Sequence, residues 1–289
     1  MRYVILADIH GNYEALIAVL RDIEAFVSEQ RTTIDQIWCL GDIVGYGPQP
    51  SECVRTVSEL CAIVIAGNHD WAAIGKLDLD EFTGVAANSA EWTGEQLTPK
   101  ERIYLRQLPE RERSGDVTLA HGSPLNPIWE YLTSPVGATP NFSAFGTTFC
   151  LVGHTHVPSI FLMPADAPLP PSAPLTPRAL TAGGINPGDS DLMVFPDLPE
   201  LAPLATGPLC EQITPTQALW VLPERHRVII NPGSVGQPRD GDPRAAYLIY
   251  DTDVGFEFRR VEYNIAATQR RMAELGLSPR MAARLTHGV

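Results

Sequence analysis

Five short apolar runs in this chain each end directly in side chains that can bind a metal ion, and this repetition constrains the fold more than any other feature. The segments that follow the runs are Asp8-Ile9-His10, Gly41-Asp42, Gly67-Asn68-His69-Asp70, His121-Gly122 and Gly153-His154-Thr155-His156. The runs have the length and composition of buried strands. Because the carboxyl ends of strands in an open α/β sheet share one edge, where ligands bind, the pattern predicts that the five segments converge on one site.

Taken singly, each of these segments has an ordinary structural explanation. Asp-x-His and His-x-His at a strand end are commonly caps or turns, and Gly-Asp and Asn-His-Asp are common in turns and loops. The shared site is favoured because all five segments follow apolar runs, in a chain that has only seven histidines. Glycines before Asp42, Asn68 and His154 would let the backbone turn sharply where each strand ends.

The residue types indicate the chemistry of such a site. Imidazole, carboxylate and amide oxygen suit divalent ions such as manganese, iron, zinc or nickel. Two ions about 3.5–4 Å apart can share one carboxylate and clamp the attacking and leaving oxygens of a phosphoryl transfer. The net charge of −13 argues against broad nucleic-acid binding, which needs a basic surface. An anionic substrate would therefore need a local positive charge, and a metal cluster supplies one.

Strand and helix patterns alternate along the chain, which predicts an α/β protein with helices on the faces of its sheets. The expected strands are residues 2–7, 37–40, 62–66, 117–120, 149–152, 227–230, 245–250 and 256–261. The expected helices are residues 13–27, 52–60, 84–95, 99–108, 265–275 and 279–285, with Thr98 as the N-cap of the fourth.

We expect residues 1–289 to form a single domain that is interrupted by a proline-rich insertion at about 163–226. So long a connection without periodicity is uncommon in a compact domain, so we interpret it as a partly mobile or lid-like insertion. A disordered linker is the alternative.

Composition also predicts the cellular setting. No apolar run reaches the roughly 18 residues that span a bilayer, and the N-terminus lacks the features of a signal peptide. The five cysteines form no C-x-x-C pair and, being odd in number, cannot all pair internally. We therefore expect a cytoplasmic protein with no membrane partner.

The order of the five segments resembles the calcineurin-like metallophosphoesterase superfamily, whose pattern is D-x-H, G-D, G-N-H-[DE], H and G-H-x-H, and every element is present. The segment from Asn231 to Gly241 is similar to that of the compact bacterial and archaeal phosphodiesterase-like members. The resemblance covers residues 1 to about 160 and 228 to about 275. It implies a four-layer α/β/β/α sandwich of two mixed sheets, with the metal site at the carboxyl ends of the strands.

The resemblance also implies roles for individual residues. The first metal would be held by Asp8, His10, Asp42 and His156, and the second by Asp42, Asn68, His121 and His154. In an extended segment, His154 and His156 would stand roughly 6–7 Å apart, so that each reaches a different ion. His69 would lie beside the phosphate as the general acid, and Asp70 would orient it. The cofactors would be two divalent ions, with manganese expected and iron, nickel, zinc or cobalt as alternatives.

The expected function is hydrolysis of a phosphate ester by a metal-activated hydroxide, as a phosphodiesterase or phosphatase. The substrate would be a phosphorylated small molecule or a nucleotide. The alternatives are a nucleotide-directed or protein phosphatase of the same superfamily, and a non-catalytic scaffold of the same fold. A scaffold would be expected to lose metal ligands, whereas this chain has them all.

A few further residues have two open interpretations each. Arg239 and Arg244 would contact substrate phosphate or form surface ion pairs, with Arg239 our candidate for substrate binding. The loop 233–236 would cradle an anion or form a tight turn between strands. Four other residues would either line a substrate pocket or pack in the core. They are Trp71, Phe82, Asn88 and Trp92.

Overall fold

Two six-stranded sheets make up the centre of the fold. The computed structural model describes residues 1–168, 210–215, 219–221 and 224–289. The first sheet consists of β1 (Arg2–Leu6), β2 (Gln36–Cys39), β3 (Ile63–Val64), β9 (Leu219–Val221), β11 (Ala245–Asp251) and β12 (Gly255–Val261). The second consists of β4 (Arg111–Ser114), β5 (Val117–Ala120), β6 (Phe149–Leu151), β7 (Ser159–Pro164), β8 (Glu211–Ile213) and β10 (His226–Asn231).

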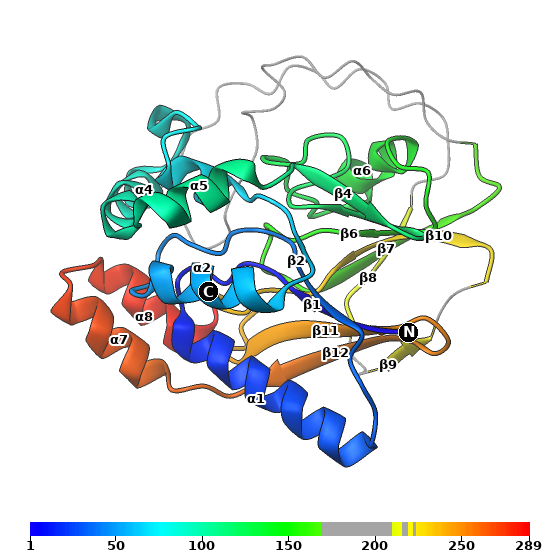
Figure 1. The fold of residues 1–289 in the computed structure, drawn as a ribbon. Coiled ribbons are helices and arrows are strands. Elements are labelled where there is room, and N and C mark those ends of the chain that lie inside the picture. The colour runs from blue at the N-terminus through cyan, green and yellow to red at the C-terminus, as the bar shows by residue number, and fades with distance from the viewer. Residues whose placement is uncertain (169–209, 216–218, 222–223) are drawn as a thin grey trace.

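Helices cover the outer faces of the stacked sheets (Figure 1). They are α1 (Tyr13–Gln30), α2 (Pro50–Leu60), α3 (Asn68–Ala73), α4 (Gly84–Gln96), α5 (Pro99–Gln107), α6 (Pro135–Ala138), α7 (Ile265–Glu274) and α8 (Pro279–His287). Two short 3₁₀ turns, Leu79–Glu81 and Thr139–Ser143, complete the helical elements. The arrangement confirms the expected α/β/β/α sandwich.

Successive side chains of β1 point to opposite faces of the sheet, so this strand contributes to two layers of the core. Val4 and Leu6 pack with the buried faces of α1 and α2, whereas Ile5 and Ala7 belong to the cluster between the two sheets. Successive side chains of a strand point to opposite faces, so a strand that is covered on both sides is apolar throughout. A third cluster, which includes Phe142 and Phe161, packs the outer face of the second sheet under α6.

Both sheets are mixed, and their parallel portions direct the polar segments to one place. The strand orders are β3-β2-β1-β11-β12-β9 and β4-β5-β6-β10-β7-β8. β1, β2 and β3 run parallel to one another, and so do β5, β6 and β10. The carboxyl ends of these six strands therefore lie at the edges of two facing sheets, as the sequence predicts.

Helix boundaries follow the local signals in the sequence. Asn12 caps α1 by accepting a hydrogen bond from the Ala15 N–H. Thr98 caps α5 in a reciprocal pair with Glu101, which confirms the expected N-cap. All six predicted helices are present, each within a few residues of its expected limits.

The structure adds elements that periodicity does not indicate. Residues 68–73 form the short helix α3 rather than a loop. β4, β8 and β9 are edge strands of three or four residues. β8 pairs with β7, and β9 pairs with β12, so the expected insertion at 163–226 contributes two short strands near its C-terminal end. Residues 169–209, 216–218 and 222–223 of that insertion lie outside the described residues.

Two predictions about the cellular setting can be compared with the structure. Within the described residues, no helix is both long and apolar enough to cross a membrane. All five cysteines are free thiols, whereas their odd number alone requires only that at least one is unpaired.

A hydrogen-bonded carboxylate ties α1 to the first sheet. Asp22 accepts hydrogen bonds from the Tyr247 hydroxyl at 2.6 Å and from Arg259 Nε at 2.9 Å. Partial burial alone would raise the pKa of Asp22, but hydrogen bonds from Arg259 and Tyr247 bring it below its ordinary value of 3.8. A carboxylate whose pKa is lowered by folding stabilises the protein above the unfolded pKa and loses that effect as pH falls through the folded value.

Replacing Asp22 with Asn should therefore lower the free energy of unfolding at pH 7 by about 0.5–1 kcal/mol, since the pair is half-exposed. The difference from the unchanged protein should shrink toward zero as pH falls below 3.8. Urea denaturation at pH 7 and pH 3 measures it. Glu24→Gln, on the exposed side of the same helix, is the control, and a difference as large at pH 3 as at pH 7 would contradict the electrostatic explanation.

Candidate metal centre

Most of the predicted metal ligands have an unusual backbone conformation. Positive φ angles occur at Asp8 (54°), His10 (50°), Asp42 (51°), His154 (68°) and His156 (61°). Residues other than glycine rarely adopt this left-handed region, and each instance costs on the order of 1 kcal/mol. The segment 154–156 is therefore a sharply turned loop, and the expected extended geometry is wrong. Such strain persists only where the surrounding structure holds it.

Backbone hydrogen bonds supply that restraint. The His10 N–H donates to the Asp42 carbonyl at 2.9 Å, which fixes the loop after β1 against the loop after β2. The His154 N–H donates to both Asp8 carboxylate oxygens at 3.1 Å, which connects the two sheets. A side chain at Gly67 would place its Cβ 2.0 Å from Asp42 Oδ1, so only glycine leaves room for that carboxylate.

The structure brings all seven predicted ligands together, and none exposes more than 3% of its surface. Donor atoms of the first expected group, Asp8, His10, Asp42 and His156, all lie within 4.8 Å of one another. Those of Asp42, His121 and His154 form a second such cluster. Asn68 joins this second cluster, because its Oδ1 lies 3.3 Å from His121 Nε2. Asp42 belongs to both, as a bridging ligand would.

Opposed lone pairs show that the first cluster fits a cation. His10 Nδ1 lies 3.1 Å from the Val44 carbonyl and His156 Nδ1 lies 2.6 Å from the Gln237 carbonyl. A carbonyl only accepts, so each Nδ1 carries a proton, and each neutral ring presents an unprotonated Nε2. These two Nε2 atoms face each other at 3.0 Å. Two lone pairs repel at that distance unless a positive charge lies between them, which is the position of a metal ion.

In the second cluster, a backbone carbonyl orients His121 in the same way. Its Nδ1 is 2.8 Å from the Leu40 carbonyl, so its Nε2 is directed at His154 Nδ1, 3.1 Å away. The same Nε2 lies 3.4 Å from Asp42 Oδ2. Backbone carbonyls thus orient three of the four histidines, as outer partners commonly do at metal sites.

The pKa shifts of the buried groups show that the carboxylates of the centre need positive charge nearby. Burial raises the pKa of Asp8 to about 7. Burial would lower the pKa of His121, but Asp42 outweighs it and raises that pKa to about 9. Burial also lowers the pKa of His10 and His156 well below 6.5, so those rings stay neutral. The donor set therefore fits two divalent cations that share the Asp42 carboxylate.

His69 lies beside the clusters without belonging to either. Its backbone N–H donates to Asp42 Oδ1 at 2.9 Å, and its ring lies 5.0 Å from that of His10. Burial lowers the pKa of His69 to about 4. Its Nδ1 is buried and has no hydrogen-bond partner among the described residues. This is the position expected for a residue that meets the substrate rather than a metal.

Asp70 contacts different groups from those expected. Its Oδ1 accepts the N–H groups of Ile43 at 2.8 Å and Val44 at 3.2 Å, and its Oδ2 accepts that of Gly67 at 2.9 Å. No hydrogen bond to the His69 ring occurs in the described part of the chain. The orienting role predicted for Asp70 is thus replaced by a bracing role, because all three partners are backbone amides of the loops that carry Asp42 and Asn68.

The two candidate arginines differ in their surroundings. Arg244 is exposed and pairs with Asp242 at 2.6 Å, so it forms a surface ion pair. Arg239 is half-buried, and its charge helps to lower the pKa of both His69 and His156. The loop 233–236 forms a turn rather than an anion cradle, since the N–H groups of Val235 and Gly236 donate to carbonyls of the β1 loop.

Aromatic residues around the centre are largely missed by sequence reasoning. Of the four candidates for a pocket wall, Trp71 is in the core, Asn88 is exposed, Trp92 is half-buried, and only Phe82 contacts the site, against His69. Tyr46 and Tyr131 also contact site histidines. Tyr46 follows Asp42 between two glycines, and this proximity is the one signal that could have singled it out.

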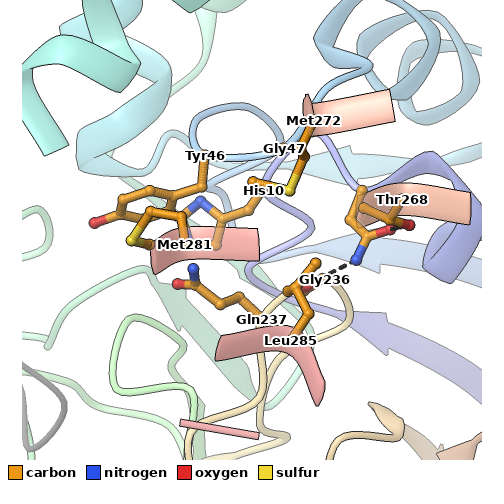
Figure 2. Close-up of a pocket in the computed structure, with 10 residues that line it drawn as sticks. His10, Tyr46, Gly47, Gly236, Gln237, Thr268, Met272, Met281 and Leu285 are labelled. Carbon is orange, nitrogen blue, oxygen red and sulfur yellow. Dashed lines mark hydrogen bonds between the residues drawn. The ribbon is translucent and has the colours of Figure 1, made fainter. Parts of the chain in front are cut away.

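A small hollow adjoins His10 on the side of the C-terminal helices. It is lined by Tyr46 and Gln237 and by Met272 and Met281 of α7 and α8 (Figure 2). Met272 and Met281 pack with Tyr46, so the last two helices support the loop that carries Asp42.

The two buried donor clusters, at the strand ends of a two-sheet sandwich, match the ligand requirements of a dinuclear metal centre. The chain belongs to the calcineurin-like phosphoesterase family, which residues 1–158 match. A metallophosphoesterase structure from Sphaerobacter thermophilus is 42% identical with a TM-score of 0.74, and the match covers 100% of this chain and 99% of that one.

Two curated relatives extend the comparison. An uncharacterized protein of Methanocaldococcus jannaschii is 32% identical over 98% of this chain and 97% of its own length. The symmetrical bis(5′-nucleosyl)-tetraphosphatase of Citrobacter koseri is 27% identical over 46% of this chain and 47% of its own length. The motif resemblance described in the sequence analysis leaves out the insertion, whereas the match to the Methanocaldococcus jannaschii protein extends over nearly the whole chain.

Removing the shared carboxylate tests the two-cluster geometry. Asp42→Ala should leave at most one ion per chain, because both clusters lose the same ligand. Metal analysis of stripped and reloaded protein measures this, with Asp80→Ala on the exposed surface as the control. Two ions per folded chain in Asp42→Ala would show that the donors do not share this residue.

The bracing role of Asp70 predicts a loss of stability. In Asp70→Asn one acceptor oxygen becomes an NH₂ group that faces backbone N–H, so unfolding should become easier by about 1–3 kcal/mol. Thermal and urea unfolding measure this change, with Asp78→Asn, an exposed cap, as the control. Native stability in Asp70→Asn, combined with the kinetic defect of a His69 variant, would instead support an orienting role.

Proposed function

We propose that this protein hydrolyses phosphate esters at its dinuclear centre, as a phosphodiesterase or phosphatase. The observation that carries the proposal is the set of seven buried donors in two clusters around Asp42, with His69 alongside. Two bound ions would supply a nucleophilic water at neutral pH and neutralise the charge of the phosphate. We propose manganese as the resident metal and the cytoplasm as the setting.

The chain's own residues have separate tasks in this reaction. The metals would be held by Asp8, Asp42, Asn68 and the four histidines of the clusters. His69, whose ring stands beside His10 and whose backbone is tied to Asp42, donates a proton to the leaving oxygen, which requires the negative charge of the bound phosphate to raise the pKa of His69 from about 4. Arg239 is the cation that we assign to the phosphate group, because its guanidinium lies 6.0 Å from the ring of Tyr46, which in turn contacts His69.

The class of substrate follows from the charge of the site and from the relatives. Once it held two divalent cations, the centre would attract an anion even though the protein has a net charge of −13. Resemblance of part of the chain to symmetrical bis(5′-nucleosyl)-tetraphosphatase supports a phosphorylated small molecule or nucleotide. The complete donor set argues against a non-catalytic scaffold.

The general-acid role of His69 predicts a dependence on the leaving group. General acid catalysis contributes about 10²–10⁴-fold, and a nitrophenolate leaves without needing a proton. His69→Ala should therefore slow alkyl or nucleoside esters about 10²-fold or more, and nitrophenyl esters much less, with unchanged metal content. Turnover of matched mono- and diesters with added Mn, Ni, Co, Mg or Zn measures this. His287→Ala, exposed in α8, is the control.

The alternatives give different results. Equal loss for both leaving groups, with both ions retained, would make His69 a phosphate-binding residue. Loss of an ion would make it a metal ligand. Absence of turnover for every ester with every metal would overturn the proposed function itself.

A further inference from the structure

Four half-buried aromatic side chains, which we call the aromatic wall, flank the metal centre: Tyr46, Phe82, Trp129 and Tyr131. Three of them form a continuous row with His69. The ring centroids of Tyr46 and His69 are 4.5 Å apart, those of His69 and Phe82 5.6 Å, and those of Phe82 and Trp129 4.9 Å. Tyr131, two residues beyond Trp129, lies 3.8 Å from the ring of the metal-cluster residue His154.

The aromatic wall is held in place from behind. The Tyr46 N–H donates to Ser89 Oγ at 2.5 Å, and the Tyr46 side chain packs against Met272 and Met281 (Figure 2). Trp129 packs on the main core. A wall supported in this way is formed before any ligand arrives, which lowers the cost of binding.

Hydrogen bonds fix the loop that carries Trp129 and Tyr131. The Gly122 N–H donates to the Pro127 carbonyl at 2.6 Å, which closes the loop after His121. Glu130 accepts hydrogen bonds from the Ser123 hydroxyl and, at 3.2 Å, from Asn141 Nδ2. Glu130 lies between the two aromatic residues in sequence, so its hydrogen bonds set the direction in which Trp129 and Tyr131 leave the loop.

The chemistry of the wall identifies what it can recognise. Aromatic side chains bind flat aromatic rings by stacking, which is worth about 1–3 kcal/mol per ring, or roughly 5- to 150-fold in affinity. His69, which stands beside the metal clusters, lies within the row between Tyr46 and Phe82, and the Arg239 guanidinium lies 6.0 Å from the Tyr46 ring. A ligand with a phosphate at the metals would therefore extend its organic group along these rings.

We propose that the aromatic wall binds a flat aromatic ring carried by the phosphate ester. This inference rests on the proposed function and names the substrate class for the same site. Two sources share this chemistry: a nucleobase, which is joined to the phosphate through a sugar, and an aryl group bonded directly to the phosphate oxygen.

Paired competitors separate these sources. Adenosine 5′-monophosphate and ribose 5-phosphate differ only by the base, whereas phenylphosphonate and cyclohexylphosphonate differ in ring planarity and resist hydrolysis. The inhibition constant of each is measured on the metal-loaded protein against a nitrophenyl ester. We expect the aromatic member of at least one pair to bind about 5- to 150-fold more tightly. The pair that shows the preference identifies the source.

Matched variants assign the preference to the wall. Phe82→Leu, which keeps the size of the side chain but removes the ring, should reduce the aromatic preference at least threefold. Phe82→Tyr should retain it. Phe26→Leu, on the half-buried face of α1 beside Arg259, is the control for loss of a ring elsewhere. Metal content and melting temperature of each variant establish that the centre is intact.

A second readout is independent of turnover. Quenching of tryptophan fluorescence is titrated with the same four compounds, with Trp129→Phe as the variant that should lose part of the signal. A native protein that binds both members of each pair equally would overturn the inference, as would an aromatic preference left unchanged in Phe82→Leu. Preferential quenching by an aromatic compound in a protein that hydrolyses no ester would support the wall while overturning the proposed function.

Discussion

The rest of the structure depends on one constraint, which is that the fold holds the unprotonated Nε2 atoms of His10 and His156 face to face. Both rings have their protons committed to backbone carbonyls, and both are buried where protonation is unfavourable. Their lone pairs are nevertheless 3.0 Å apart. The fold therefore holds donors in positions that are unfavourable without a cation, and the strained backbone at five of the seven ligands has the same origin. Holding the donors in these positions lowers the stability of the fold, and binding of a metal ion would remove that cost.

The two-sheet sandwich is a direct means of assembling such a set. The parallel strands of the first sheet deliver Asp8, Asp42 and Asn68, and those of the second deliver His121 and His154. Each sheet alone would complete neither cluster. Contacts such as the bond from the His154 N–H to Asp8 connect the sheets at the metal centre itself. The centre is thus part of the packing of the sandwich and not an attachment to it.

The sequence predicts the layers and the ligands better than the contacts among them. Strands and helices with clear periodicity are present, because burial on one or both faces determines their patterns. The contacts of Asp70 cannot be predicted from the sequence, because its partners are backbone amides, which leave no trace in residue identity. The turned backbone of His154 and His156 depends on tertiary hydrogen bonds, so strand periodicity could not reveal it. Tyr46 and Tyr131 become neighbours of the centre only when the loops fold.

The order of the strands has a consequence for synthesis. β10 and β11 come late in the chain, yet β10 lies between β6 and β7, and β11 lies between β1 and β12. Until these residues leave the ribosome, β1 and β6 each expose an unpaired edge, although every metal ligand has already been made. Unpaired edges of apolar strands are sites of misassociation. The nascent protein thus carries complete metal-binding segments on two unfinished sheets, and assembly of the centre must await the last third of translation.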